Sequence, residues 1–170
     1  LWLHLLDPHG PLRPHPDLPA DPSAAGLDEE QRLYRDEVRF TFLHLDRTIR
    51  ALQEAGLWQE SVTIFVSDHG EMLHADGHEA PILGKDGKPM RRGHGKALYQ
   101  ELMEVPLIVR PPEGLEERRR IDALVSHTDL HDTVADLLDV GIPKVGRDRV
   151  SLAPYLAPSP TGISERPWAL

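Results

Sequence analysis

The pattern of apolar and polar positions along this chain predicts short strands that alternate with helices. Two apolar runs rich in β-branched and aromatic residues, Val62–Val66 and Val105–Val109, are typical of buried strands. Leu1–Leu6 predicts a further short strand, and Ile121–Val125 a shorter one. Strands that alternate with helical segments indicate an α/β class with a mostly parallel sheet flanked by helices. We therefore expect residues 1–170 to form a single α/β region.

The longest periodic segment predicts an amphipathic helix over residues 28–56. Apolar residues recur there at spacings of three and four, which is the period of a helix face packed on a core. Asp28 is a suitable N-cap, and the two acidic residues after it suit the positive end of the helix dipole. Gly56 is expected just beyond the end of the helix. A second helix is expected over Asp129–Val140, with Asp129 as its N-cap.

Two segments lack a sustained period and predict loops. Residues 8–26 contain six prolines, each of which fixes its own φ and removes a hydrogen-bond donor. Such a loop is either a surface connector or part of the wall of a substrate pocket. Residues 70–96 contain six glycines and several histidines. Two of these, His74 and His78, carry no signal beyond their loop position and are expected to be solvated.

The bulk composition narrows the possible functions. Of the 170 residues, 39% are hydrophobic and 28% are charged, as in ordinary globular domains. The formal net charge of -9 argues against nucleic acid as the main partner. No apolar run approaches the roughly 20 residues that a membrane helix needs. Cysteine is absent, which excludes disulfides and a cysteine nucleophile within this sequence. Because Leu1 already lies in an expected strand, we expect the chain to be a fragment.

The first candidate for chemistry is the sequence Asp68-His69-Gly70, directly after the expected strand Val62–Val66. Ligands of open α/β sheets bind beyond the carboxyl ends of the strands. An Asp68 oxygen and a His69 nitrogen can together hold a divalent cation. The alternative is an Asx turn with a surface histidine, because the tripeptide alone is a weak signal.

Three further blocks join this tripeptide in an order that matches one enzyme family. The blocks are Asp7-Pro8-His9-Gly10-Pro11, Gly93-His94-Gly95-Lys96 and Ser126-His127-Thr128-Asp129. Together, over roughly residues 1–156, they resemble the sulfatase family of the alkaline phosphatase superfamily. The resemblance implies an alkaline-phosphatase-like α/β fold. It also implies that this chain holds the later part of the catalytic domain and is incomplete at the N-terminus.

The resemblance implies roles for five residues. Asp68 and His69 are expected as metal ligands. His9 is expected to contact the sulfate and the leaving oxygen, which leaves poorly unless it is protonated or paired with positive charge. His94 matches the His-Gly variant found in more distant members and is expected as a second catalytic histidine. Lys96, whose spacing to the following tyrosine is one residue shorter than the familiar one, is expected as an auxiliary substrate-binding cation.

The resemblance also implies two cofactors. The first is a divalent metal, with calcium as the leading candidate. Many family members carry Asn where His69 stands, and a histidine ligand makes manganese or zinc acceptable as well. The second is a formylglycine nucleophile, which forms in a Cys-or-Ser-x-Pro-x-Arg block that this sequence lacks. That block and the remaining acidic ligands are expected in the missing N-terminal part, so the fragment alone is expected to be inactive.

The implied function is metal-dependent hydrolysis of sulfate esters, on either a small molecule or a glycan. One alternative is a phosphonate or phosphate ester hydrolase, or a phosphotransferase, of the same superfamily, because sulfate and phosphate are similar tetrahedral oxyanions. A further alternative is a non-catalytic partial family member. The retention of His9, Asp68, His69 and His94 weighs against that last reading, because a decayed site is expected to lose some of them.

Overall fold

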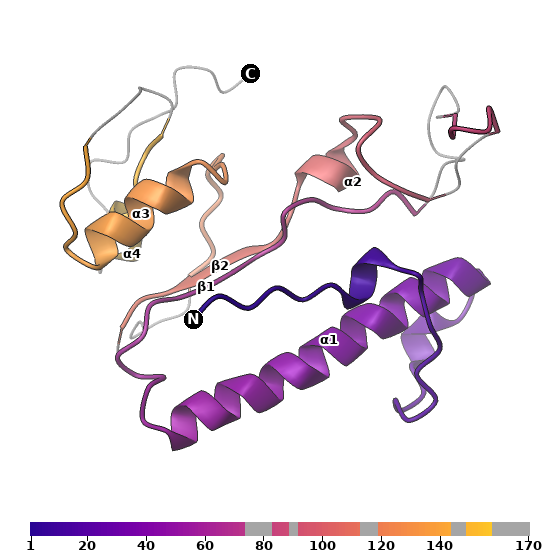
Figure 1. The fold of residues 1–170 in the computed structure, drawn as a ribbon, viewed down its shortest axis with the longest axis horizontal. Coiled ribbons are helices and arrows are strands. Elements are labelled where there is room, and N and C mark those ends of the chain that lie inside the picture. The colour runs from indigo at the N-terminus through magenta and orange to yellow at the C-terminus, as the bar shows by residue number, and fades with distance from the viewer. Residues whose placement is uncertain (74–82, 89–91, 113–118, 144–148, 158–170) are drawn as a thin grey trace. The chain divides into compact units, whose positions relative to one another are not determined.

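The chain divides into two compact units, Leu1–Trp58 and Gln59–Leu170, and each unit is described by itself (Figure 1). The structure, a computed structural model, describes residues 1–73, 83–88, 92–112, 119–143 and 149–157.

The first unit is dominated by the long helix α1, Glu29–Glu54. Its start is a capping box: Asp28 Oδ1 accepts from the backbone N–H of Gln31 at 2.8 Å, and the Gln31 side chain accepts from the backbone N–H of Asp28 at 3.1 Å. Gly56 follows the helix with φ 70°, a conformation that glycine adopts without strain. The predicted helix and both of its ends are therefore confirmed.

The segment before α1 contains no strand, so the prediction for Leu1–Leu6 is wrong. A strand needs a hydrogen-bonded neighbour, and no described residue pairs with this segment. Leu1 is fully exposed. The proline-rich loop forms only two short 3₁₀ helices, η1 (Asp7–His9) and η2 (Pro22–Ala24), and each has proline near its start, where the missing N–H costs nothing.

A buried carboxylate on α1 fixes part of the proline-rich loop. Glu37 is 3% exposed, and its two oxygens lie 2.7 Å from the backbone N of Arg13 and 2.7 Å from Nε2 of His15. The His15 ring also stacks on Phe40, with ring centroids 4.1 Å apart. The most buried residues of α1 are thus polar, whereas the predicted apolar stripe is only partly covered, with Phe42 50% exposed.

The second unit contains a pair of antiparallel strands, β1 (Thr63–Val66) and β2 (Leu107–Arg110), drawn side by side in Figure 1. Both lie within two residues of their predicted positions. Their antiparallel pairing differs from the expected mostly parallel sheet. Parallel neighbours need a crossover connection, usually a helix. The helix described between these strands, α2 (Gln100–Met103), is a single turn, and the chain comes back along β1 in the opposite direction.

Two more helices follow β2. Helix α3 spans Asp129–Leu137 and α4 spans Ala153–Leu156. The segment Ile121–Val125, predicted as a short strand, forms no ladder with any described residue and is not a strand. A four- or five-residue apolar run does not by itself supply a pairing partner, and pairing is what makes a strand.

The prediction of Asp129 as the N-cap is wrong, because the N-cap of α3 is Thr128 and Asp129 is the first residue of the helix. The Asp129 side chain is fully buried and accepts two backbone N–H groups, from Ser126 at 2.8 Å and from Val150 at 3.0 Å. It therefore ties the turn before α3 to the segment before α4. The buried hydroxyl of Thr133 accepts a third backbone N–H from that same segment.

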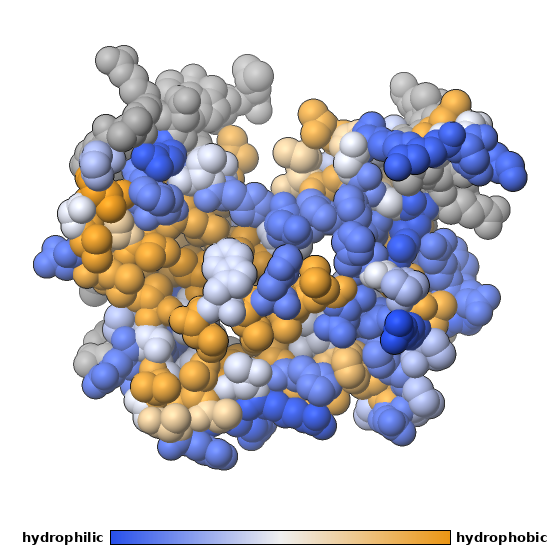
Figure 2. Space-filling model, in the orientation of Figure 1, coloured by the Kyte–Doolittle hydropathy of each residue, from blue (hydrophilic) through white to orange (hydrophobic). Residues whose placement is uncertain are grey.

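Large apolar side chains reach the surface in both units, and Figure 2 shows several orange areas open to solvent. These exposed side chains include Trp2 in the first unit and Leu98, Met103 and Ile108 in the second. Among the described residues, none of the helices has both the length and the apolar character of a membrane span.

Candidate active site after strand β1

The Asp-His-Gly turn begins where β1 ends and is held by local hydrogen bonds. The Ser67 hydroxyl donates to the backbone carbonyl of His69 at 2.6 Å, and the His69 N–H donates to Asp68 Oδ1 at 2.9 Å. From the start of α3, Nε2 of His127 lies 2.8 Å from the carbonyl oxygen of Ser67. These contacts fix the backbone that carries Asp68 and His69.

Gly70 is required because two backbone segments meet there. Its N–H donates to the carbonyl of Leu102 at 2.9 Å, next to the end of α2. A Cβ at position 70 would lie 1.8 Å from the backbone oxygen of Glu101, far inside any allowed contact. The glycine of the motif therefore lets the turn pack closely against the α2 segment. A larger residue would not fit, because the atoms that it would meet belong to the backbone and not to a flexible side chain.

Asp68 and His69 present neighbouring donors of the kinds that a divalent metal uses. His69 Nδ1 lies 2.7 Å from the carbonyl oxygen of Gly70, so it is the protonated nitrogen, and Nε2 carries the lone pair of the neutral ring. Metal-binding histidines are commonly fixed in this way, by a carbonyl that holds the other ring nitrogen.

His69 Nε2 is 3.8 Å from Asp68 Oδ2, and the Asp68 side chain is 77% exposed. This pair fits part of a metal site. The described ranges hold no group of three or more potential ligands.

His94 lies against His69. Its ring centroid is 4.0 Å from that of His69, with the ring planes inclined by 34°. The backbone places it there through an isolated bridge, in which Met72 and Gly93 exchange N–H···O bonds of 3.1 and 3.2 Å. His94 Nδ1 is 3.1 Å from Oε2 of Glu71. The structure thus brings three of the five predicted site residues together.

For the two remaining predicted residues, the structure gives no contact with this turn. Lys96 is exposed, and its ammonium donates to the backbone carbonyl of Leu83 at 3.0 Å. His9 is an exposed residue of η1 in the first unit. Its role at the site stays a prediction. His74 and His78 lie outside the described residues.

Sequence reasoning missed two residues of this cluster. Glu71 directly follows the motif, but nothing in the sequence indicates that its side chain is buried against His94. His127 belongs to the last block, where it carried no separate signal, and only the fold reveals its contact with the turn.

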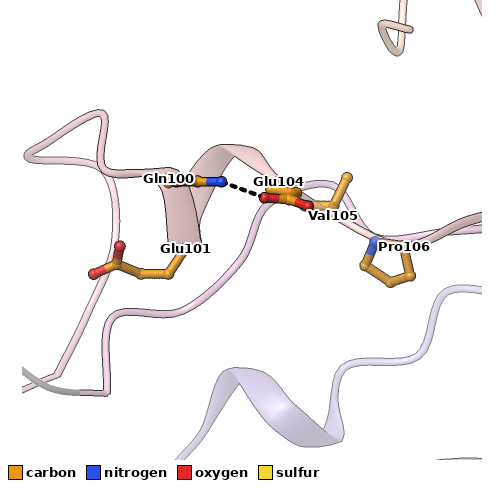
Figure 3. Close-up of a pocket in the computed structure, with 5 residues that line it drawn as sticks. All are labelled: Gln100, Glu101, Glu104, Val105 and Pro106. Atoms are coloured by element: carbon orange, nitrogen blue, oxygen red, sulfur yellow. Dashed lines mark hydrogen bonds between the residues drawn. The ribbon is translucent and has the colours of Figure 1, made fainter. Parts of the chain in front are cut away.

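A pocket beside α2 is separate from the turn that carries Asp68 and His69. It is a shallow depression lined by Gln100, Glu101, Glu104, Val105 and Pro106 (Figure 3). None of the predicted site residues lines it. Two of its five residues are acidic, and two carboxylates would repel a sulfate monoester, which is itself an anion. Gln100 Nε2 donates to Glu104 Oε2 at 2.7 Å, so one of them is engaged in a local contact.

Comparison with known families agrees with the order of the motifs. The family model described as Sulfatase matches residues 1–140. The chain belongs to the sulfatase family. The match includes the Asp-His-Gly turn, the His94 block and the start of α3.

Several proteins with sequences similar to this chain are named as sulfatases. The uncharacterized sulfatase YidJ of Escherichia coli K12 is 36% identical over 104 residues, which is 59% of this chain and 17% of the relative. The steryl-sulfatase of Mus musculus is 31% identical over 147 residues, which is 86% of this chain and 23% of the relative. An endo-4-O-sulfatase of Bacteroides thetaiotaomicron is 30% identical over 113 residues, 66% of this chain and 20% of the relative. The chain therefore spans about a fifth of the length of these relatives. No solved structure matches.

Proposed function

We propose that the complete protein is a metal-dependent sulfuric ester hydrolase, and that the turn after β1 belongs to its active site. The observation that carries the proposal is the contact between His69 and His94, 4.0 Å apart by ring centroids, beside the Asp68 carboxylate. The sequence separates the two histidines by 25 positions, yet the fold places them in one cluster at the end of a strand, where ligands of α/β sheets bind.

Asp68 and His69 would hold the metal, through a carboxylate oxygen and Nε2. When bound, the metal would polarise the sulfate group, and the formylglycine expected in another part of the protein would supply the attacking oxygen. We propose calcium, with manganese or zinc compatible with the His69 nitrogen. The substrate would be a small-molecule or glycan sulfate ester.

The histidines would act on the charge that develops during the reaction. We propose that His9 donates a proton to the leaving oxygen, because a departing alkoxide needs protonation. As an imidazolium, His94 would donate a hydrogen bond to the sulfate group, and Lys96 would add a positive charge nearby once its side chain leaves the Leu83 carbonyl. The role of His9 depends on the leaving group, so experiment can separate it from the other two.

The leaving group tests the role of His9. In the complete protein, His9→Ala should slow aryl sulfates with poor leaving groups more than aryl sulfates with good ones, since a good leaving group needs little protonation. His4→Ala, a change at an exposed histidine five residues away, serves as the control. An equal loss on both kinds of ester would mean that His9 orients the substrate and is not the acid.

The substrate panel tests the proposal against its alternative. Sulfate and phosphate esters carry similar tetrahedral groups, so the same panel includes a phosphate monoester and a phosphonate ester with matched leaving groups. Turnover of the sulfate ester in preference to both supports the proposal. Turnover only of the phosphorus esters would make the protein a phosphoryl hydrolase of the same superfamily. We expect the isolated 170-residue chain to turn over none of them.

A further inference from the structure

Glu71 is a buried carboxylate beside the candidate site, and the proposed function gives it no task. Its side chain is 6% exposed, whereas that of Asp68 three residues earlier is 77% exposed. One of its oxygens, Oε1, is buried with no hydrogen-bond partner in the part of the chain that the structure describes. Burial of a polar group without a full set of partners is unfavourable. The contact made by its other oxygen, Oε2, is therefore expected to explain why this carboxylate is buried.

The other oxygen contacts a site histidine. Glu71 Oε2 lies 3.1 Å from Nδ1 of His94. An ionised carboxylate can only accept a hydrogen bond, so Nδ1 must carry a proton, and in the neutral ring the lone pair is then on Nε2. A carboxylate behind a histidine is a known way of fixing both the tautomer and the orientation of the ring.

The backbone holds this pair together independently of the side chains. Met72 and Gly93, the neighbours of Glu71 and His94 in sequence, exchange two N–H···O bonds, and Met72 is 1% exposed. The His94 ring also rests on His69, with centroids 4.0 Å apart. One edge of the ring thus meets a carboxylate and one face meets another ring, which leaves it little freedom to rotate.

We propose that Glu71 is a positioning residue that holds His94 in the Nδ1-protonated tautomer and fixes the orientation of its ring. The consequence for catalysis rests on the proposed function. The tautomer itself does not, because it follows from the contact between Glu71 and His94. Glu71 acts through His94 and is not itself expected to touch the substrate or the metal.

The tautomer is measured directly. The complete protein is labelled with ¹⁵N-histidine, and His94 is assigned by comparison with His94→Ala. Protonated and unprotonated ring nitrogens resonate far apart, so the spectrum reports which one carries the proton. We expect Nδ1–H in the wild type and in Glu71→Gln, whose amide oxygen can still accept. We expect Glu71→Leu, which keeps most of the volume but has no acceptor, to lose this tautomer in favour of Nε2–H or a mixture.

Kinetics and metal content separate positioning from a structural or ligand role. Glu71→Leu should lower kcat on an aryl sulfate by about 10–100-fold, the usual effect of removing a group that orients a site residue, with KM nearly unchanged. Glu71→Gln should recover most of that loss. Metal content should equal that of the wild type in both variants. The exposed Glu60→Gln is the matched control and should change nothing.

Several results would overturn the proposal. Nε2–H in wild-type His94 would do so, as would retention of Nδ1–H in Glu71→Leu. If Glu71→Leu does not fold, the wild-type spectrum and Glu71→Gln still decide the tautomer. Loss of metal in Glu71→Gln would make Glu71 a ligand instead. A wild-type enzyme with the expected tautomer and no sulfate turnover would refute the proposed function and leave the positioning of His94 intact.

Discussion

Replacement of Gly70 by alanine tests why a glycine follows Asp68 and His69. The added Cβ would lie 1.8 Å from the Glu101 oxygen and 2.9 Å from the Glu101 carbonyl carbon. Both atoms belong to the backbone, so no rotamer change relieves the overlap. The turn and the α2 segment must move apart, which breaks the 2.9 Å bond from the Gly70 N–H to Leu102.

The expected cost of Gly70→Ala has two parts. Overpacking of a close contact costs about 1–3 kcal/mol, and loss of a hydrogen bond costs about 0.5–1.5 kcal/mol. We therefore expect the free energy of unfolding to fall by about 1.5–4.5 kcal/mol, as these two effects combine. Because the turn carries Asp68 and His69, we also expect the variant to lose hydrolysis of an aryl sulfate.

The control is Gly141→Ala. Nothing lies within 4 Å of a Cβ at position 141, and this glycine does not have a positive φ. Alanine at such a position is expected to be neutral or to stabilise by about 0.4–1 kcal/mol. Urea unfolding of the complete protein, compared at equal protein concentration, measures both variants. Equal unfolding of Gly70→Ala and Gly141→Ala would refute the close approach of the turn to the α2 segment.

Three further predictions follow from the contacts of individual carboxylates. Asp68→Ala removes an anionic metal donor, so elemental analysis of the complete protein should find less metal; unchanged occupancy would exclude Asp68 as a ligand. Glu37→Ala removes the hydrogen-bond acceptor of His15 and of the Arg13 backbone N–H, so it should destabilise the protein by about 2 kcal/mol. Glu37→Gln should destabilise it less. Equal unfolding midpoints for the wild type and Glu37→Ala would show that Glu37 does not hold the loop in place. The Ser23 and Arg35 hydrogen bonds lower the pKa of Asp21 from 3.8 to about 2. The stability that this shift contributes is present above about pH 4 and is lost as pH falls toward 2. The unfolding midpoints of the wild type and Asp21→Asn should therefore converge over that range. A constant difference between them would contradict the lowered pKa.

The sequence is most informative where a property depends on neighbours along the chain. Helix α1 is predicted at both ends, because capping by Asp28 and termination by Gly56 are local interactions. Strands β1 and β2 are found within two residues because their β-branched runs are bounded by polar turns. Their antiparallel pairing is missed, since the direction of a neighbouring strand depends on the path of 40 intervening residues.

The strand predicted for Leu1–Leu6 shows the same limit. Apolar residues predict that a segment will be covered, but a strand also requires a partner, and no described residue supplies one. A partner far away in sequence leaves no trace in the composition of the segment itself.

The candidate site is predictable in its residue types and not in its connections. The motif order predicts Asp68, His69 and His94 as site residues, and the fold brings these three together. The buried Glu71 escapes prediction because its burial comes from the Met72–Gly93 bridge, which joins residues 21 positions apart. An exposed and a buried glutamate look the same in a sequence.

Release of inorganic sulfate by the complete protein tests directly whether it is a metal-dependent sulfuric ester hydrolase. The substrate is 4-nitrophenyl sulfate, with 4-nitrophenyl phosphate at equal concentration in a parallel reaction, and the wild type is compared with Asp68→Ala. We expect the wild type to release sulfate with a higher kcat/KM than phosphate, and Asp68→Ala to lose both its metal and this release. No sulfate release from the metal-replete wild type, or equal release from Asp68→Ala, would contradict this function.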